Sequence, residues 1–213
     1  MNHKTKQKVE REGVIQFTCQ QTARLPDYPE ALIQLANTWR SLMLKKGWIG
    51  QTPGRYQGLG FGNLSLGFSC PRYPHAFLIT ASQTGHLPVL PATYWTRVVD
   101  ASLAENRVLA EGSYPPSSEA MSHAALYQAR ADIQAVIHIH SPELWEKAQH
   151  QGVACTAAEI PYGTPQMAEA LAHQAQASSG LVVMLGHQDG LLAWGPNLEA
   201  AARLLASVAE APG

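Results

Sequence analysis

Two histidines separated by one residue are the part of this sequence best suited to chemistry. They are His138 and His140, in Ile137-His138-Ile139-His140. Side chains alternate between the two faces of a β-strand, so both imidazoles would point to one face and both isoleucines to the other. Imidazole nitrogens bind divalent metals, and a strand fixes their separation. A half-buried strand end whose histidines bond to water or backbone explains the pair equally well, so the pair alone leaves both interpretations open.

A third histidine would complete a set of metal ligands. His187 lies in Leu185-Gly186-His187-Gln188-Asp189-Gly190, between two apolar segments that we expect to be strands. Three protein ligands with one open position are typical of a catalytic zinc site. The competing interpretation of His187 is a loop histidine without a role.

A carboxylate follows two hydroxyls in Pro115-Pro116-Ser117-Ser118-Glu119. Helix-start preferences alone account for this segment, because serine caps helices and an acidic residue interacts well with the helix dipole. The functional interpretation is that Ser117 and Ser118 bind an anion at the helix N-terminus, while Glu119 acts as a general acid or base beside a metal. Spacing alone favours the structural interpretation.

These residues need a framework of strands and helices to position them. Apolar periodicity and capping residues predict helices over residues 30–46, 118–130, 142–150, 164–180 and 197–210, and the segment 94–99 also reads as helical. In the first helix the apolar positions are Leu32, Leu35, Ala36, Trp39, Leu42 and Met43. Short apolar segments predict strands over residues 63–68, 75–80, 107–111, 135–140, 181–185 and 191–194. Strands mixed with helices in this way predict a layered α/β domain.

Composition excludes several classes of protein. The chain has 213 residues, of which 46% are hydrophobic and 15% charged, so it can form one domain with its own core. A net charge of -1 gives no basic surface for nucleic acid or an anionic membrane. No apolar segment approaches the ~18 residues that a membrane span requires, and the polar N-terminus lacks the features of a secretory signal. Three scattered cysteines fit a reducing compartment, so we expect a cytoplasmic protein.

Several short motifs follow one another in a recognisable order. They are Gly62-Asn63-Leu64-Ser65, Phe77-Leu78-Ile79-Thr80, Ser117-Ser118-Glu119 with His123 on the next helix, His138-Ile139-His140-Ser141-Pro142, His187 before Gly190-Leu191-Leu192-Ala193-Trp194-Gly195, and Leu198-Glu199-Ala200. In this order, from about Pro29 to the end, the chain resembles the class II aldolase/adducin family. Each motif is short, but their shared order over most of the chain is hard to obtain by chance.

The resemblance implies a three-layer α/β/α domain around a mainly antiparallel central sheet. It would span residues 1–213, with residues 1–28 as an N-terminal extension. It also implies one divalent metal per chain, with zinc the expected ion, bound by His138, His140 and His187. In the family, the carboxylate at the position of Glu119 faces the metal and acts as the acid/base.

The resemblance further implies a substrate phosphate held by Asn63, Ser117 and Ser118. The compact Thr-Pro-Ser-Gly turn that binds phosphate in the family is replaced here by Thr80-Ala81-Ser82-Gln83-Thr84-Gly85. Its register is shifted, and its candidates for anion binding are Ser82, Thr84 and Gly85. Aldolases of the family also bring a tyrosine from a C-terminal tail to the site. The last tyrosine here is Tyr162, so Tyr127 and Tyr162 are the candidate substitutes.

The predicted function is that of a metal-dependent lyase of the aldolase type. It would act on a small hydroxy-carbonyl compound or sugar phosphate through a metal-stabilised enediolate. Dehydration and epimerisation share this intermediate and remain alternatives, as does a non-catalytic adducin-like association domain. A metallohydrolase barrel is disfavoured because too few residues follow His140 to complete it. Expected partners are a small-molecule substrate and further copies of the chain in a tetramer, with no nucleic acid and no membrane.

Overall fold

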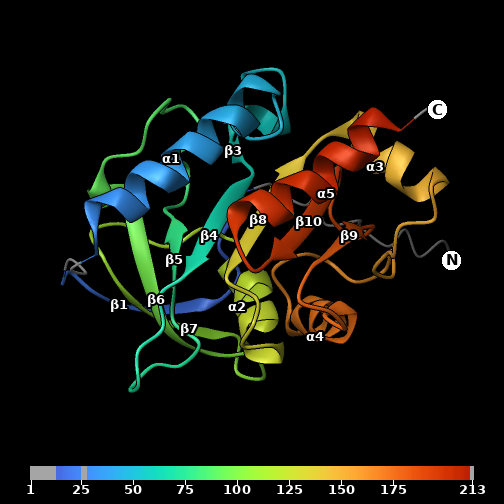
Figure 1. Cartoon of the computed structure of the whole chain (residues 1–213). Helices are drawn as coiled ribbons and strands as arrows, with labels where there is room; N and C mark the ends of the chain where they lie inside the picture. Colours follow the sequence, from blue (N-terminus) through green and yellow to red (C-terminus); the bar gives the residue numbers. More distant parts are fainter. Residues whose placement is uncertain (1–12, 25–27, 212–213) are drawn as a thin grey trace, which may run out of the picture.

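The computed structural model describes residues 13–24 and 28–211, and within them eight strands form one sheet (Figure 1). The strands are β1 (Thr18–Thr22), β4 (Asn63–Gly67), β5 (Phe77–Thr80), β6 (Trp95–Ser102), β7 (Arg107–Glu111), β8 (Ala135–His140), β9 (Gly180–Met184) and β10 (Gly190–Gly195). Their order is β1-β7-β6-β5-β4-β8-β10-β9. Only β1 and β7 pair in parallel, so the expected α/β fold with a mainly antiparallel sheet is confirmed. The short strands β2 (Gly50–Gln51) and β3 (Gly60–Phe61) pair separately.

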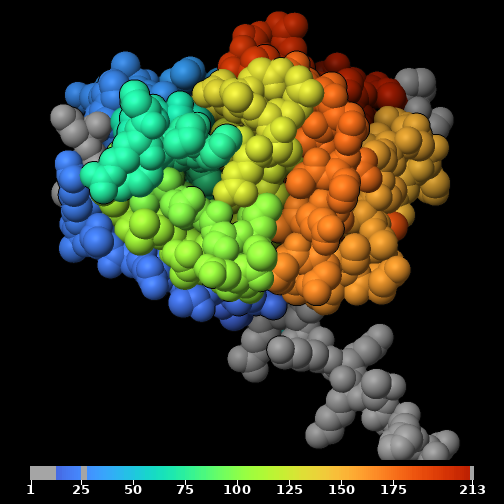
Figure 2. All heavy atoms as spheres, turned by 90° about the horizontal axis from the view of Figure 1, so that it is seen from below, coloured from blue at the N-terminus to red at the C-terminus, as the bar shows by residue number. Residues whose placement is uncertain are grey.

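Two apolar clusters hold the helices against this sheet. One cluster includes residues of α1 (Glu30–Lys45), α3 (Pro142–His150) and α5 (Leu198–Glu210), and the other includes residues of α2 (Ala120–Ala129) and α4 (Pro165–Gln174). Figure 2 looks onto the second group, where α2 in yellow and α4 in orange lie next to each other. Along β8, Ile137 and Ile139 belong to the first cluster and Val136 to the second. Because side chains alternate, His138 and His140 lie on the face that α2 and α4 cover.

The expectation of a helix over residues 94–99 is wrong. This segment begins the strand β6, after a single 3₁₀ turn at Ala92–Tyr94. Its β-branched and aromatic side chains suit a strand that is buried on both faces: Trp95 belongs to the first cluster and Val98 to the second. Hydrogen bonding to both β5 and β7 therefore overrides the weak helical pattern.

The end of α4 and the presence of β1 also differ from expectation. Helix α4 ends at Gln174, and Gly180 begins β9 instead of closing the helix. A Cβ at Gly180 would lie 2.1 Å from the ring of Trp194, so close strand packing is the reason for this glycine. The strand β1 was not predicted and lies within residues 1–28, the range expected to be an extension. Its polar sequence, TCQQT, is typical of an exposed edge strand and carries no apolar alternation.

Candidate metal centre and anion pocket

Three histidines meet where β8 and β10 lie side by side. His138 and His140 come from β8, and His187 comes from the turn that joins β9 to β10. One ligand nitrogen from each ring can be chosen so that all three lie within 4.8 Å of one another. The Nε2 atoms of His138 and His140 are 2.9 Å apart. All three side chains are buried, so the sequence-predicted ligands form one enclosed cluster.

The surroundings of His138 and His140 favour the neutral forms of these two rings. Nδ1 of His138 lies 3.1 Å from the carbonyl oxygen of Leu191, so Nδ1 donates a proton there and Nε2 presents its lone pair to the cluster. Burial, assisted by the charges of His187 and Arg55, lowers the pKa of His140 well below its ordinary value of 6.5. A neutral imidazole is the form that binds a metal.

The geometry of the cluster fits a divalent transition metal. A tetrahedral zinc ion with bonds of 2.0–2.1 Å would hold its ligand nitrogens about 3.3 Å apart. The nitrogens of the cluster, 2.9 Å apart at one pair and all within 4.8 Å, need only small side-chain rotations to reach that spacing. Calcium and magnesium prefer oxygen ligands, so a set of three imidazoles selects against them.

Two glycines set the shape of the turn that carries His187. A Cβ at Gly186 would lie 1.7 Å from the carbonyl oxygen of Ile160, so the turn presses directly against that backbone. This contact accompanies the stacking of Tyr162 on His187, with ring centroids 4.4 Å apart and planes 15° from parallel. A Cβ at Gly190 would crowd the rings of His138 and His187 at 3.3 Å. His187 can therefore occupy this position only because Gly186 and Gly190 have no side chains.

Glu119 lies beside the third histidine. It precedes α2 and is completely buried, with Oε1 3.7 Å from Nδ1 of His187. Its Oε2 accepts a 2.6 Å hydrogen bond from the hydroxyl of Ser122. Glu119 is the N-cap residue of α2, and its side chain makes no capping hydrogen bond to the helix. The arrangement is that of a carboxylate within reach of a ligand bound at the histidines.

The residues predicted to bind an anion line one pocket. The lining residues are Gly13, Gly60, Gly62, Asn63, Ala81, Ser82, Gln83, Thr84, Gly85, Ser117 and Ser118. The backbone of Ser117 donates to the carbonyl of Thr80, which joins the start of α2 to the loop after β5. Asn63 stands opposite His138 in the pairing of β4 with β8. This register connects the pocket to the histidine cluster.

Five of the lining residues are not among the predicted anion-binding residues: Gly13, Gly60, Gly62, Ala81 and Gln83. Oε1 of Gln83 accepts a 2.8 Å hydrogen bond from the backbone of Gly60, and its Nε2 donates to the carbonyl of Gly13 at 3.3 Å. Gln83 lies between Ser82 and Thr84 in the loop predicted to bind an anion, so the residues on either side of it indicated this position. Gly13 is distant in sequence, and no pattern indicated it.

A second unpredicted group lies against His140. The ring of Tyr56 lies 4.9 Å from that of His140, and its hydroxyl donates a 2.8 Å hydrogen bond to Asp189. Arg55 donates to the hydroxyl of Tyr56 at 3.0 Å and to the carbonyl of His140 at 3.2 Å. Tyr56 and Gln57 have φ of 46° and 59°, a conformation that non-glycine residues rarely adopt. These residues connect the loop between β2 and β3 to both ligand-bearing elements.

Other candidate residues lie elsewhere. His123 is buried, with Nδ1 2.7 Å from the hydroxyl of Ser65, which in turn lies 2.8 Å from that of Tyr127. Burial lowers the pKa of His123 to about 3. Tyr127 stacks on Phe77 within the second apolar cluster, so only Tyr162 of the two candidate tyrosines contacts the histidine cluster. His86, in the loop that follows the anion-pocket residues Thr84 and Gly85, is exposed.

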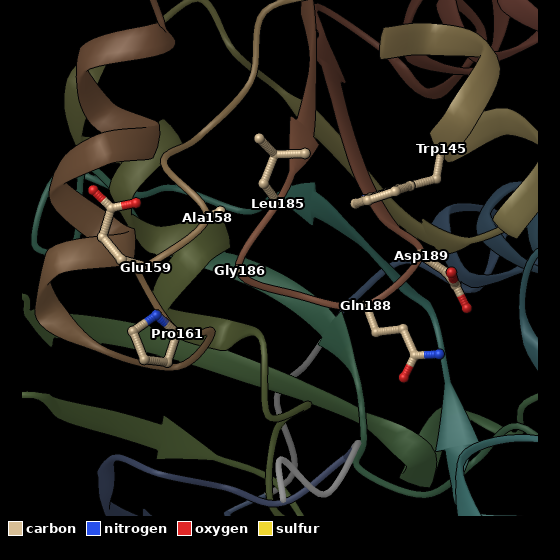
Figure 3. A pocket seen from close by; sticks show the side chains of 8 residues that line it. All are labelled: Trp145, Ala158, Glu159, Pro161, Leu185, Gly186, Gln188 and Asp189. Atoms are coloured by element: carbon tan, nitrogen blue, oxygen red, sulfur yellow. The ribbon is translucent and has the colours of Figure 1, made fainter. Parts of the chain in front are cut away.

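An open pocket borders the turn that carries His187. It is lined by Trp145, Ala158, Glu159, Pro161, Leu185, Gly186, Gln188 and Asp189 (Figure 3). Asp189 connects this pocket to Tyr56 through the hydrogen bond described above. No described helix has the length and apolar character needed to cross a membrane.

Comparison with known proteins agrees with the resemblance noted in the sequence. The family model for the Class II Aldolase and Adducin N-terminal domain matches residues 41–211. A search of curated proteins gave no significant match. Among solved structures, an L-fuculose 1-phosphate aldolase is 22% identical, with a TM-score of 0.61 over 85% of this chain and 83% of that one.

Two further solved structures share the fold. The L-fuculose-1-phosphate aldolase of Thermus thermophilus is 19% identical, with a TM-score of 0.61 over 85% of this chain and 91% of that one. The sugar-phosphate aldolase of Thermotoga maritima is 14% identical, with a TM-score of 0.62 over 84% and 92%. At these identities the similarity demonstrates a common fold and leaves the reaction to be argued from the site.

Proposed function

Because the chain belongs to the class II aldolase and adducin family, we propose that it is a divalent-metal-dependent lyase of the aldolase type. Its substrate would be a small hydroxy-carbonyl compound or a sugar phosphate. One observation carries this proposal: three buried histidine nitrogens converge, and the carboxylate of Glu119 lies 3.7 Å from one of these rings. The named structural relatives are sugar-phosphate aldolases, which supports the same class of substrate.

In this proposal His138, His140 and His187 hold the metal, with zinc the expected ion and one ion per chain. A divalent ion held there would act as a Lewis acid toward the oxygens of a hydroxy-carbonyl substrate. Glu119 moves the proton of the reacting carbon, since it lies next to the cluster and is shielded from water. In the cleavage direction it delivers a proton to the carbon of the enediolate once the C–C bond has broken, and in the reverse direction it removes that proton. The hydrogen bond from Ser122 holds Oε2, which leaves Oε1 directed toward His187.

The opposite end of the substrate would bind in the pocket near Asn63, Ser82, Thr84, Gly85, Ser117 and Ser118. Its hydroxyls and backbone amides suit a phosphate, and its connection to the histidines through Asn63 gives a substrate two points of attachment. Tyr162 is the one candidate tyrosine that touches the cluster. We also propose a single three-layer α/β/α domain over residues 1–213, a homotetramer and a cytoplasmic location.

Dehydration and epimerisation are the alternatives that use the same site. All three reactions share an enediolate-type intermediate beside a carbonyl, so the histidines and Glu119 would serve each of them. A non-catalytic association domain has less support, because such a role needs neither three convergent histidines nor a buried carboxylate beside them.

The experiment is a metal analysis followed by a substrate screen. Protein purified without chelator is expected to contain about one divalent ion per chain, and His187→Ala should lose most of it while the exposed control His173→Ala keeps it. The metal-loaded protein is then incubated in D₂O with free and phosphorylated ketoses, while exchange, cleavage and dehydration are followed together. Glu119→Gln should retain metal and lose exchange. Metal-free wild-type protein, or exchange at the normal rate in Glu119→Gln, would contradict the proposal.

A further inference from the structure

A buried arginine stands behind the loop that forms the anion pocket. Arg40 lies on α1, and its side chain is 1% exposed. Its guanidinium donates to three carbonyl oxygens of that loop: to Thr84 at 2.7 Å, to Leu87 at 2.6 Å and to Pro88 at 3.4 Å. Within residues 13–24 and 28–211, no carboxylate pairs with Arg40. Its charge is therefore hydrogen-bonded but not neutralised.

A buried cation without a counter-charge is unusual. Arginine is rarely fully buried unless it is paired, because removing its charge from water costs several kcal/mol. Burial lowers the pKa of Arg40 to about 10, which still leaves the group charged at neutral pH. None of the residues lining the anion pocket is basic. Arg40 is thus a fixed positive charge directly behind a pocket whose own polar groups are neutral.

One peptide group connects Arg40 to the pocket. The carbonyl of Thr84 points at the guanidinium, and in a trans peptide the N–H of the next residue points the opposite way. That residue is Gly85, which lines the pocket. Its nitrogen lies 3.3 Å from the place a Cβ would take on Gly60, another lining residue. By binding the carbonyl, Arg40 both orients this peptide and polarises its N–H toward a ligand.

We propose that Arg40 is a positioning residue that makes this pocket select a phosphate group on the substrate. The inference rests on the proposed function in one respect, namely that the pocket receives the non-reacting end of the substrate. Phosphate is favoured over carboxylate because the hydroxyls of Ser82, Ser117 and Ser118 and the N–H of Gly85 offer donors to several oxygens at once. The charge of Arg40 supplies the long-range attraction that these neutral donors lack.

The test compares the affinity for inorganic phosphate, measured by calorimetry, among four proteins: wild type, Arg40→Met, Arg40→Lys and Lys45→Met. Lys45 is exposed on the same helix, so its variant loses the same charge away from the pocket. We expect Arg40→Met to weaken phosphate binding about tenfold or more, since a charge several ångströms away in a protein interior has that magnitude of effect. Arg40→Lys should be intermediate, because lysine keeps the charge but lacks the planar, forked guanidinium that donates to these carbonyls. Lys45→Met should match wild type.

Two control measurements, acetate binding and metal affinity, separate the possible failures. Acetate should bind wild type more weakly than phosphate, and equal or tighter acetate binding would overturn the choice of phosphate. Metal affinity, measured by chelator competition, should be the same in all four proteins, a result that general damage to the fold would not give. If Arg40→Met does not fold, the inference is tested by comparing Arg40→Lys with wild type. A phosphate affinity of Arg40→Lys equal to that of wild type would then overturn the inference. Wild-type protein that binds phosphate but no metal would instead contradict the proposed function alone.

Discussion

Ser122 donates a 2.6 Å hydrogen bond to Oε2 of Glu119, three residues before it in the chain. Both side chains are almost fully buried, so water does not compete for this contact. A hydroxyl that donates to a carboxylate stabilises its charged form and restricts its rotation. Within the proposed site, Ser122 therefore prepares Glu119 to accept a proton from the substrate.

Ser122→Ala should move the acidic limb of the rate profile to higher pH. Without the donor, the charged carboxylate is less stable, so more base is needed to ionise it. We expect this limb to shift by about one pH unit, with metal content unchanged. The measurement is kcat against pH for this variant and for Ser207→Ala, an exposed serine on α5. Superimposable profiles for wild type and Ser122→Ala would show that the hydrogen bond has no such role.

The local part of this site could be predicted from sequence. Strand alternation alone directs His138 and His140 to one face, and Ser117 and Ser118 directly precede Glu119, so their proximity follows from the chain. The pairing of His187 with these histidines depends on sheet order, which periodicity does not encode. The resemblance to the family, through the order of its motifs, is what indicated that His187 joins the other two histidines.

Arg40 shows why other parts could not be predicted. The apolar stripe expected on α1 included Leu35 and Leu42, yet these side chains are 50% and 41% exposed, while Arg40 is buried. The helix is rotated relative to the expected stripe, since its buried residues are Ile33, Ala36, Arg40 and Met43. The carbonyls that bind Arg40 lie in a loop more than forty residues further along the chain. Hydrogen bonds to backbone leave no trace in the residue types of the loop, so this burial had no sequence signal.

Tyr56→Phe should weaken metal binding. The Tyr56 hydroxyl joins Asp189, two residues after His187, to a loop that also contacts His140. Loss of such outer contacts typically lowers metal affinity by 10–100-fold, and we expect about tenfold here. Chelator competition gives the affinity, and the visible spectrum of the cobalt-substituted protein reports the ligand geometry. Tyr73→Phe, in a surface turn, is the control. Identical affinities and spectra for wild type and Tyr56→Phe would contradict this expectation.

Gly186→Ala should destabilise the protein and disturb the metal site together. The new Cβ would stand 1.7 Å from the carbonyl oxygen of Ile160, and because that atom is backbone, no side-chain rotation relieves the clash. We expect a loss of about 2–4 kcal/mol in the free energy of unfolding. Gly54→Ala, where no atom lies within 4 Å, should change it by less than about 0.5 kcal/mol. The measurement is the free energy of unfolding in urea for the two variants. Equal values for Gly186→Ala and Gly54→Ala would contradict the packing argument.

His123 should make the protein less stable in acid. Its pKa is about 3 in the folded protein against an ordinary value of 6.5, because burial disfavours the charged ring. Below pH 6.5 the unfolded chain therefore binds a proton at His123 that the folded protein does not. Its contribution to stability is complete above that pH and is lost progressively as the pH falls toward 3.

The measurement is the free energy of unfolding in urea between pH 7 and pH 4, for wild type, His123→Gln and the exposed control His150→Gln. The slope against pH counts the protons taken up on unfolding, so His123→Gln should reduce it by up to one proton. Contributions from the metal-site histidines are common to all three proteins and cancel in the comparison. The exposed control His150→Gln should leave the slope close to that of wild type. A His123→Gln slope equal to that of wild type would mean that His123 titrates alike whether the chain is folded or not.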